Sequence, residues 1–270
     1  MAKRTVAKKK NEDEVLNDIF QGFNNALLST IKIDIKHKNE TQKKLTNSIK
    51  TNDVTICTGP AGTGKTLLSV AEALILLKTK PNVYKKIKLV KSIIQLRNEE
   101  LGILPGDEKE KLKFYMMSFM DAFYKLIGEA NTNKLIDAGL IQFEVFGQIR
   151  GRSWENTILI VDEFQNITHD NAKTFLTRFS NDTKIIVLGD SGQIDLKHKE
   201  DSSLERLANE VKNRPTDGVE VVEFDESEIV RHRLTSYFIN IFKEPEKQKH
   251  QLQSKPKKLT FWEKVKNFFV

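Results

Sequence analysis

A glycine-rich loop between two apolar segments carries the strongest chemical signal in the sequence. Residues 59–66 complete the pattern G-x-x-x-x-G-K-[ST]. In such a loop the glycines let backbone N–H groups face a nucleoside triphosphate, the lysine reaches the β- and γ-phosphates, and the final hydroxyl binds Mg²⁺. An apolar-periodic helix follows the loop, so the phosphates would lie at a helix N-terminus. The predicted phosphate-binding residues are Gly59, Pro60, Ala61, Gly62, Thr63, Gly64, Lys65 and Thr66.

Two adjacent acids follow a continuously apolar segment, Ile158-Leu-Ile-Val161. An acid at the end of a buried strand can hold the Mg²⁺ water shell, and we expect this role for Asp162, together with Thr66 as the second metal-binding residue. Glu163 is placed to polarise an attacking water as a general base. Without the glycine-rich loop, the two acids could equally begin an ordinary surface loop. Gln165 and Asn166 extend the pattern toward D-E-x-Q.

A third apolar segment, residues 185–188, ends in Gly189-Asp190-Ser-Gly-Gln193. Gln193 is a candidate for hydrogen bonding to the γ-phosphate or to the attacking water, and Asp190 is a candidate for supporting the Mg²⁺ shell. The alternative is a simple exit from a strand into a turn.

The segments that would position these groups alternate between strand and helix patterns. Such alternation predicts an α/β protein with a mostly parallel sheet and helices on both faces. A helical pattern over 15–31, a short alternating strand over 31–35 and a helix over 41–49 come first. Predicted strands cover 53–58, 86–91, 141–146, 157–162, 184–189 and 219–224. Predicted helices cover 65–79, 109–128, 169–179, 201–212 and 228–242.

Composition limits the class of protein. The 270 residues are 39% hydrophobic and 30% charged, which is typical of a soluble globular chain with a substantial core. No apolar stretch approaches the ~20 residues of a spanning helix, and no signal peptide is visible, so we expect a cytoplasmic protein without a membrane span. The single cysteine, Cys57, cannot form an internal disulfide and is expected in the core.

The net charge of +7 lies at the two ends of the chain. The first ten residues carry five Lys or Arg and no acid, and residues 243–270 carry eight Lys and three Glu, which leaves the body slightly acidic. We therefore expect a flexible basic arm over 1–14, one domain over 15–242, a polar linker over 243–258 and an amphipathic segment over 259–270. Basic arms contact nucleic acid or anionic lipid in some proteins and are merely solvated in others.

The amphipathic segment at the C-terminus gathers aromatic residues on one helical face, with Phe261, Trp262, Val265, Phe268 and Phe269 at i, i+1, i+4, i+7 and i+8. Such a short helix is marginal alone, so we expect it to pack on something. The body of the protein, a groove on a partner or sister subunit, and an anionic membrane surface are the three alternatives.

Taken together, the motifs resemble the PhoH-like family of P-loop ATPases, which is similar to a single motor domain of superfamily 1 helicases. The resemblance rests on residues 59–66, 101–111, 150–153, 162–166, 176–178, 189–196 and 229–232, in family order. It implies a P-loop NTPase with a RecA-like fold and Mg²⁺-dependent ATP hydrolysis. It also implies nucleic-acid coupling, with RNA favoured over DNA, and an oligomer that could be a ring. Links to phosphate starvation and bacteriophages come from the resemblance alone. Val90-Lys91-Ser92 departs from the family's usual Thr-Arg-Pro.

Two further residues receive roles from this resemblance. Gln42 lies where superfamily 1 motors place an adenine-reading glutamine, which would favour ATP over GTP; the alternative is a glutamine on a helix surface. Arg231 is the first candidate for an arginine that stabilises the γ-phosphate in the transition state, in cis or from another subunit, and Arg178 is the second. A salt bridge with the acids between Glu223 and Glu228 is the alternative for Arg231.

Two classes of function fit the whole pattern. The first is an ATP hydrolase coupled to nucleic acid, with Glu163, Lys65, Gln193 and Arg231 as catalytic residues. The second is an ATP-gated switch, in which slow hydrolysis times the docking of a protein partner. A P-loop kinase fits less well, because Asp162-Glu163 with Gln193 suits activation of water better than transfer to a substrate.

Overall fold

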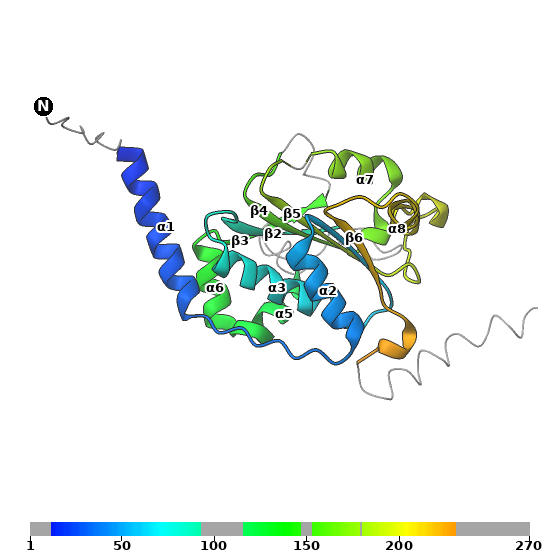
Figure 1. Ribbon diagram of the computed structural model, residues 1–270, viewed down its shortest axis with the longest axis horizontal. Coiled ribbons are helices and arrows are strands. Elements are labelled where there is room, and N and C mark those ends of the chain that lie inside the picture. The colour runs from blue at the N-terminus through cyan, green and yellow to red at the C-terminus, as the bar shows by residue number, and fades with distance from the viewer. Residues whose placement is uncertain (1–11, 93–115, 147–152, 179, 231–270) are drawn as a thin grey trace, which may run out of the picture. The chain divides into compact units, whose positions relative to one another are not determined.

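Six strands form one parallel sheet in the computed structural model, which describes residues 12–92, 116–146, 153–178 and 180–230 (Figure 1). The strand order is β3-β2-β4-β5-β1-β6, and every neighbouring pair runs parallel. The strands are β1 (Val54–Thr58), β2 (Lys86–Lys91), β3 (Ile141–Val145), β4 (Thr157–Asp162), β5 (Thr183–Gly189) and β6 (Val219–Glu223). The described residues up to Ile229 form one unit, and only Val230 is described from the second unit, residues 230–270.

Helices cover both faces of this sheet (Figure 1). One face carries α2 (Glu40–Thr51), α3 (Lys65–Thr79) and α5 (Met117–Ile127), with α6 (Glu129–Asp137) beside α5. The other face carries α7 (His169–Leu176) and α8 (Leu204–Asn213). The N-terminal helix α1 (Glu12–Thr30) reaches α3, where Lys78 Nζ donates to the Ile31 carbonyl at 2.7 Å. Short 3₁₀ turns are η3 (Phe164–Asn166), η4 (Lys199–Asp201) and η5 (Glu226–Glu228).

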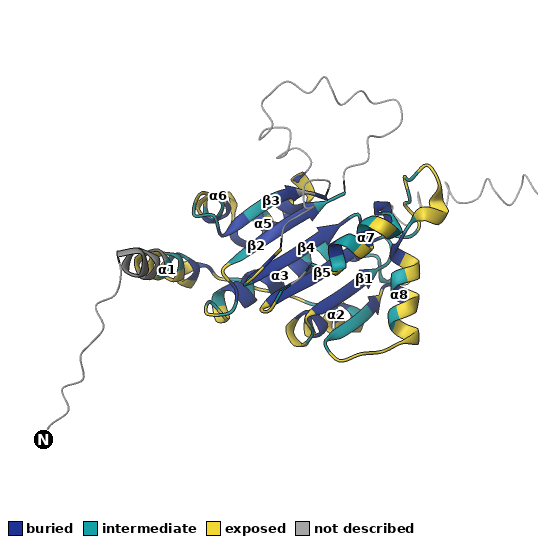
Figure 2. Ribbon diagram, turned by 90° about the horizontal axis from the view of Figure 1, so that it is seen from above, coloured by how far each residue is buried: buried dark blue, intermediate teal, exposed yellow. Residues whose placement is uncertain are grey.

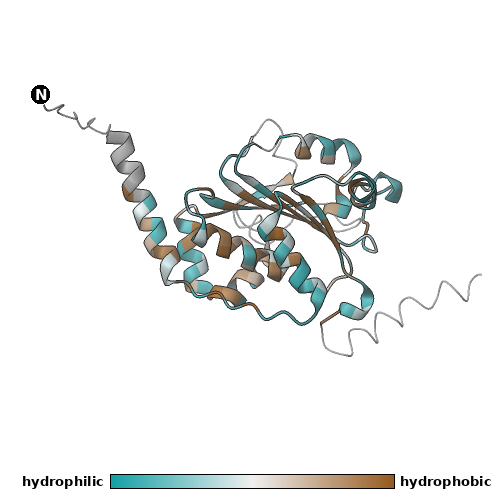
Figure 3. Ribbon diagram, in the orientation of Figure 1, coloured by the Kyte–Doolittle hydropathy of each residue, from teal (hydrophilic) through white to brown (hydrophobic). Residues whose placement is uncertain are grey.

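Alternating side chains of the central strands supply two separate cores. Ile158 and Ile160 of β4 face the α3 side, whereas Leu159 and Val161 face the α7 side. All six residues of β4 are buried, which explains why this segment reads as a continuous apolar run. Figure 2 shows the buried strands between helices whose outer faces are exposed, and Figure 3 shows the same division in hydropathy.

The six predicted strands and the helix over 65–79 are confirmed. The strand predicted over 31–35 is wrong, because residues 31–37 form no regular element. Its isoleucines alternate because Ile31, Ile33 and Ile35 pack against the larger core cluster, and this packing needs no strand partner. The predicted helix 15–31 begins earlier, at Glu12.

A second helix, α6, was not predicted. The pattern favoured one helix over 109–128, but Gly128 adopts a positive φ of 78° between α5 and α6 and changes the direction of the chain. Residues 109–115, most of the helix predicted over 228–242, and all of 243–270 lie outside the described residues. The same holds for residues 1–11 of the basic arm predicted over 1–14, whereas residues 12–14 belong to α1. Within the described part of the chain, no helix is long and apolar enough to cross a membrane.

Candidate nucleotide-binding site

The predicted functional loops meet at the carboxyl edge of the sheet, because β4, β5 and β1 are neighbours and run in the same direction. The phosphate loop follows β1, the two acids end β4, and Gly189-Asp190 ends β5. The connection from β1 crosses β5 and β4 to reach β2, whereas the connection from β5 crosses β1 in the opposite direction to reach β6. The neighbouring strands β1 and β5 therefore form a topological switch point of the sheet. Open α/β sheets bind ligands outside the carboxyl ends of their strands at such places.

The phosphate loop curls around the ammonium group of its own lysine. Lys65, the first residue of α3, donates from Nζ to the carbonyl oxygens of Gly59 at 2.6 Å and Pro60 at 2.8 Å. Gly59 has a φ of 135°, and a Cβ there would lie 2.6 Å from the Phe224 carbonyl oxygen, so only glycine fits. Burial lowers the pKa of Lys65, while nearby acids oppose that shift. The loop therefore presents a helix N-terminus and a lysine to an anion.

Asp162 ends β4 and is only 8% exposed as a residue. Its Oδ1 accepts the Glu163 N–H at 3.0 Å. Burial, with a contribution from the charge of Glu163, raises the pKa of Asp162 to about 6, and Lys91 acts in the opposite direction. A buried carboxylate of this kind is stabilised by a cation. The donor set fits Mg²⁺, which binds through one or two carboxylate or hydroxyl oxygens and completes its shell with phosphate and water; Asp162 and Thr66 would hold it.

Glu163 begins the turn after β4 in the left-handed region, with a φ of 57°. Its side chain is 38% exposed, and Oε2 accepts a hydrogen bond from Gln165 Nε2 at 2.6 Å. Lys91 ends β2 directly beside Asp162 in the strand register, and its Nζ lies 4.0 Å from Glu163 Oε1. A non-glycine residue at positive φ is uncommon and concentrates at functional turns. The carboxylate of Glu163 is therefore held by the Gln165 amide and remains partly exposed to solvent.

Gln165 and Asp190 tie the three loops together, and the sequence pattern did not reveal these contacts. The amide oxygen of Gln165 accepts the Asp190 N–H at 3.1 Å, and Asp190 Oδ2 accepts the Ala61 N–H of the phosphate loop at 3.0 Å. The Asp190 carboxylate also accepts a hydrogen bond from Gln193 Nε2 at 2.8 Å, and its support of the Mg²⁺ shell remains a prediction. Gln193 itself is exposed at this edge. The signal for Gln165 was its place two residues after the predicted base.

Gln42 is buried against the phosphate loop, at 3% exposure, so the alternative of a surface glutamine is wrong. Its Nε2 donates to the Thr63 carbonyl at 2.9 Å, and its Oε1 accepts the Lys38 N–H at 2.7 Å. The amide retains one N–H and one lone pair for a further partner. Its adenine-reading role remains a prediction.

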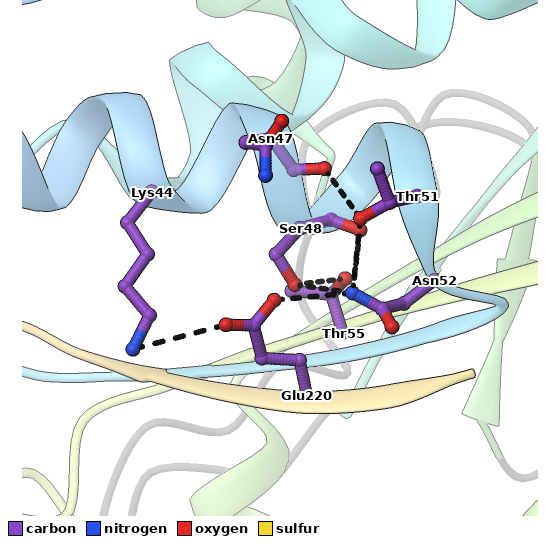
Figure 4. Close-up of polar contacts among 7 residues, drawn as sticks. All are labelled: Lys44, Asn47, Ser48, Thr51, Asn52, Thr55 and Glu220. Atoms are coloured by element: carbon purple, nitrogen blue, oxygen red, sulfur yellow. Dashed lines mark hydrogen bonds and ion pairs between the residues drawn. The ribbon is translucent and has the colours of Figure 1, made fainter. Parts of the chain in front are cut away.

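Contacts along α2, most of them toward its C-terminal end, fix the helix that carries Gln42 (Figure 4). Asn52 Nδ2 donates to Glu220 Oε2 of β6 at 3.1 Å, and Lys44 lies 3.8 Å from the other oxygen of this carboxylate. Ser48 and Thr55 exchange a hydrogen bond of 3.0 Å between α2 and β1. Helix α2 is therefore attached to the sheet at one end and to the phosphate loop at the other.

Arg231 lies outside the described residues, so its catalytic role remains a prediction. Arg178, the second candidate, follows α7 and is half-buried. Its backbone N–H donates to the Phe175 carbonyl at 3.2 Å. Cys57 is fully buried in β1, as expected, and burial raises its pKa to about 12.

The glycine-rich loop on β1, the acids ending β4 and the six-stranded parallel sheet define a P-loop NTPase with a RecA-like fold. The protein-family model described as PhoH-like protein matches residues 34–243, and the chain belongs to this family.

Several relatives align with most of the chain. The PhoH-like protein of Bacillus subtilis is 35% identical over 236 residues, which cover 87% of this chain and 71% of that protein. The PhoH-like protein of Mycobacterium tuberculosis is 34% identical over 77% of this chain and 58% of its own length. Protein PhoH of Escherichia coli is 32% identical over 73% of this chain and 55% of its own. Among solved structures, the Pif1 helicase of Candida albicans aligns with a TM-score of 0.38 and 18% identity, over 77% of this chain and 43% of the helicase.

Proposed function

We propose that this protein is a Mg²⁺-dependent ATP hydrolase. One observation carries the proposal: Lys65, Asp162 and Glu163 converge at one sheet edge, and the Glu163 carboxylate is held there by a buried glutamine. Phosphoryl transfer depends mainly on positioning and on charge stabilisation, and this edge provides a helix N-terminus, an ammonium group and two acids.

Each residue has a distinct task in this proposal. The backbone N–H groups of residues 59–66 and the Lys65 ammonium bind the phosphates, while Thr66 and Asp162 hold Mg²⁺, which neutralises developing charge. Glu163 accepts a proton from the attacking water. Gln193 orients that water or contacts the γ-phosphate, and Arg231, in cis or from another subunit, stabilises the transition state. The remaining amide capacity of Gln42 supports a preference for adenine.

The wider role extends from the family membership and from the resemblance to a single helicase motor domain. Hydrolysis is coupled to nucleic-acid binding or remodelling, with RNA favoured over DNA, in the cytoplasm. The site is proposed to work in a homo-oligomer, in which another copy can supply the arginine if it acts in trans.

Two substitutions test the chemistry. Lys65→Ala removes a phosphate-binding charge and should abolish both tight ATP binding and hydrolysis. Glu163→Gln removes the base while leaving the phosphate and Mg²⁺ ligands, so ATP binding should survive and hydrolysis should fall. Lys125→Ala, an exposed lysine on α5, is the matched control. Turnover at the wild-type rate in Glu163→Gln would refute the assignment.

A panel of RNA and DNA tests the coupling. ATP turnover that accelerates with RNA or DNA supports the motor or remodelling function. Turnover that ignores nucleic acid and responds only to a protein partner would support the ATP-gated switch instead. The mass of the native protein, measured with and without nucleotide, gives the number of subunits in the assembly.

A further inference from the structure

Gln165 is a fully buried side chain whose amide uses three hydrogen bonds at the site edge. Its Nε2 donates to Glu163 Oε2 at 2.6 Å and to the Gln193 carbonyl at 3.1 Å, and its Oε1 accepts the Asp190 N–H at 3.1 Å. Both N–H groups of the amide are therefore committed. A buried amide satisfied in this way has a single orientation, because any rotation leaves polar groups unpaired.

The side chain of the next residue, Asn166, makes a similar tether, and its hydrogen bonds go to Asp195 rather than to the Glu163 carboxylate. It is 8% exposed, its Nδ2 donates to Asp195 Oδ2 at 3.3 Å, and its Oδ1 accepts the Asp195 N–H at 2.8 Å. Gln165 and Asn166 therefore both attach η3 to the segment after β5. Only Gln165 also binds the Glu163 carboxylate, which makes Asn166 a matched control within the same turn.

The second neighbour of the base holds it less firmly. Lys91 Nζ lies 4.0 Å from Glu163 Oε1, beyond hydrogen-bond distance, and Lys91 also donates to Ser118 Oγ at 3.3 Å. Without Gln165, the half-exposed carboxylate would be free to swing toward this ammonium group. The distance between a base and its water decides the rate of proton transfer, and a displacement of about 1 Å can cost ~100-fold.

We propose that Gln165 is a positioning residue that fixes the Glu163 carboxylate and couples it to the phosphate loop. The connection runs from Ala61 N–H to Asp190, from Asp190 to Gln193, and through Gln165 to Glu163. Every step is a hydrogen bond between described residues. A shift of the phosphate loop around a nucleotide therefore moves the base through directional contacts, the last of them made by the buried amide of Gln165. This inference rests on the proposed ATP hydrolysis.

Close packing supports the same connection at the end of β5. A Cβ on Gly189 would lie 2.9 Å from Gln165 Oε1 and 2.5 Å from Leu204 Cδ2. The glycine therefore leaves the space that the amide needs to reach the Asp190 N–H.

The test compares Gln165→Met with Asn166→Leu, both close in volume to the residues they replace. We expect Gln165→Met to lower kcat by ~10- to 100-fold, while KM and the Kd for a non-hydrolysable ATP analogue change by less than about threefold. Asn166→Leu should keep kcat within about threefold. Gln165→Glu, which keeps the acceptor for Asp190 but loses both donors, should resemble Gln165→Met and serves if the methionine variant does not fold.

A second measurement asks whether Gln165 acts through the base. Glu163→Asp shortens the carboxylate by one methylene and breaks the contact, so adding Gln165→Met should lower kcat by less than about threefold further. Independent, multiplying losses would overturn the proposal, as would an equal loss in Asn166→Leu or an unchanged kcat in Gln165→Met. These failures are distinct from failure of the proposed function, which would show as the absence of any Lys65-dependent hydrolysis in the wild-type protein.

Discussion

Two clusters of polar side chains lie toward opposite ends of α3 and β5. The first, at the candidate site, contains Lys65, Asp162 and Glu163; the second contains Glu72, Lys184 and Lys50. At the carboxyl edge, α3 begins with Lys65 and β5 ends with Gly189; toward the other edge, α3 carries Glu72 and β5 carries Lys184. Glu72 is 1% exposed, and neither of its carboxylate oxygens has a hydrogen-bond partner among the described residues. Its nearest cation is Lys50, whose Nζ lies 3.6 Å from Oε2, while Lys184 donates to the Asn52 carbonyl.

Burial shifts proton affinities in both clusters, so a perturbed pKa does not by itself identify the site. Burial raises the pKa of Glu72 and lowers that of Lys184 to about 8, just as it raises the pKa of Asp162 to about 6. The difference lies in the surroundings. Asp162 and Glu163 stand beside the glycine-rich phosphate loop and its Lys65 ammonium group, whereas Glu72 and Lys184 are buried between helix and sheet. Perturbed groups become a candidate site only where convergent donors and space accompany them.

The largest expected effect separates the two clusters by activity. Glu163→Gln should lower kcat by ~100- to 10,000-fold, because a general base contributes this much. Glu72→Gln, which alters a more deeply buried acid on α3, should leave kcat and KM within about threefold. Steady-state ATP hydrolysis with matched protein concentrations measures both. A large loss of kcat in folded Glu72→Gln would break the comparison.

Gly189→Ala should act at the site through packing. The added Cβ would meet Leu204 and Gln165, so we expect a loss of roughly 1–3 kcal/mol in the free energy of unfolding, together with a lower kcat. Gly22→Ala on α1, with nothing within 4 Å of the new Cβ, is the control and should gain about 0.5–1 kcal/mol. Urea denaturation measures both. Equal effects of the two substitutions would contradict the close approach at Gly189.

Lys184 should make stability depend on pH at the opposite cluster. Its pKa falls from 10.5 to about 8 on folding, so the unfolded chain binds more protons between these values and the free energy of unfolding rises with pH across that window. Relative to Lys184→Met, the wild-type protein should gain roughly 1–2 kcal/mol between pH 7.5 and 9.5. Lys125→Met on the surface should show no such gain. If the difference in free energy of unfolding between wild type and Lys184→Met did not change with pH, this lysine would not be desolvated.

The smallest expected effect concerns Cys57, whose thiol should not react with alkylating reagents in the native protein. It lies in β1, and burial raises its pKa to about 12, so almost no thiolate forms at pH 8. Because it is the single cysteine, iodoacetamide labelling followed by mass spectrometry reports it alone. Labelling should require urea. Rapid labelling of the native protein would show that the strand below the phosphate loop opens.

Much of the fold was readable from local patterns, with identifiable failures. The run Ile158–Val161 predicted a central strand because both faces of a parallel strand are buried. The alternation of apolar and polar residues wrongly predicted a strand over 31–35, because isoleucines that pack on the core can alternate without a strand partner. The sequence pattern also missed α6, because Gly128 interrupts an otherwise continuous helical pattern with a positive φ. The alternation of Lys184 with apolar residues gave no indication that its ammonium group is buried.

The sequence by itself determined the chemistry available to this protein: a loop of glycines ending in Lys65-Thr66, and acids that end an apolar strand. Those are local properties, set by the φ freedom of glycine and by strand period. Only the tertiary structure decided which groups meet, because the strand order β3-β2-β4-β5-β1-β6 depends on long crossovers and on packing between distant segments. Ala61 and Asp190 are 129 residues apart and share a hydrogen bond, and Gln165 became the link to Glu163 because β4 and β5 end side by side.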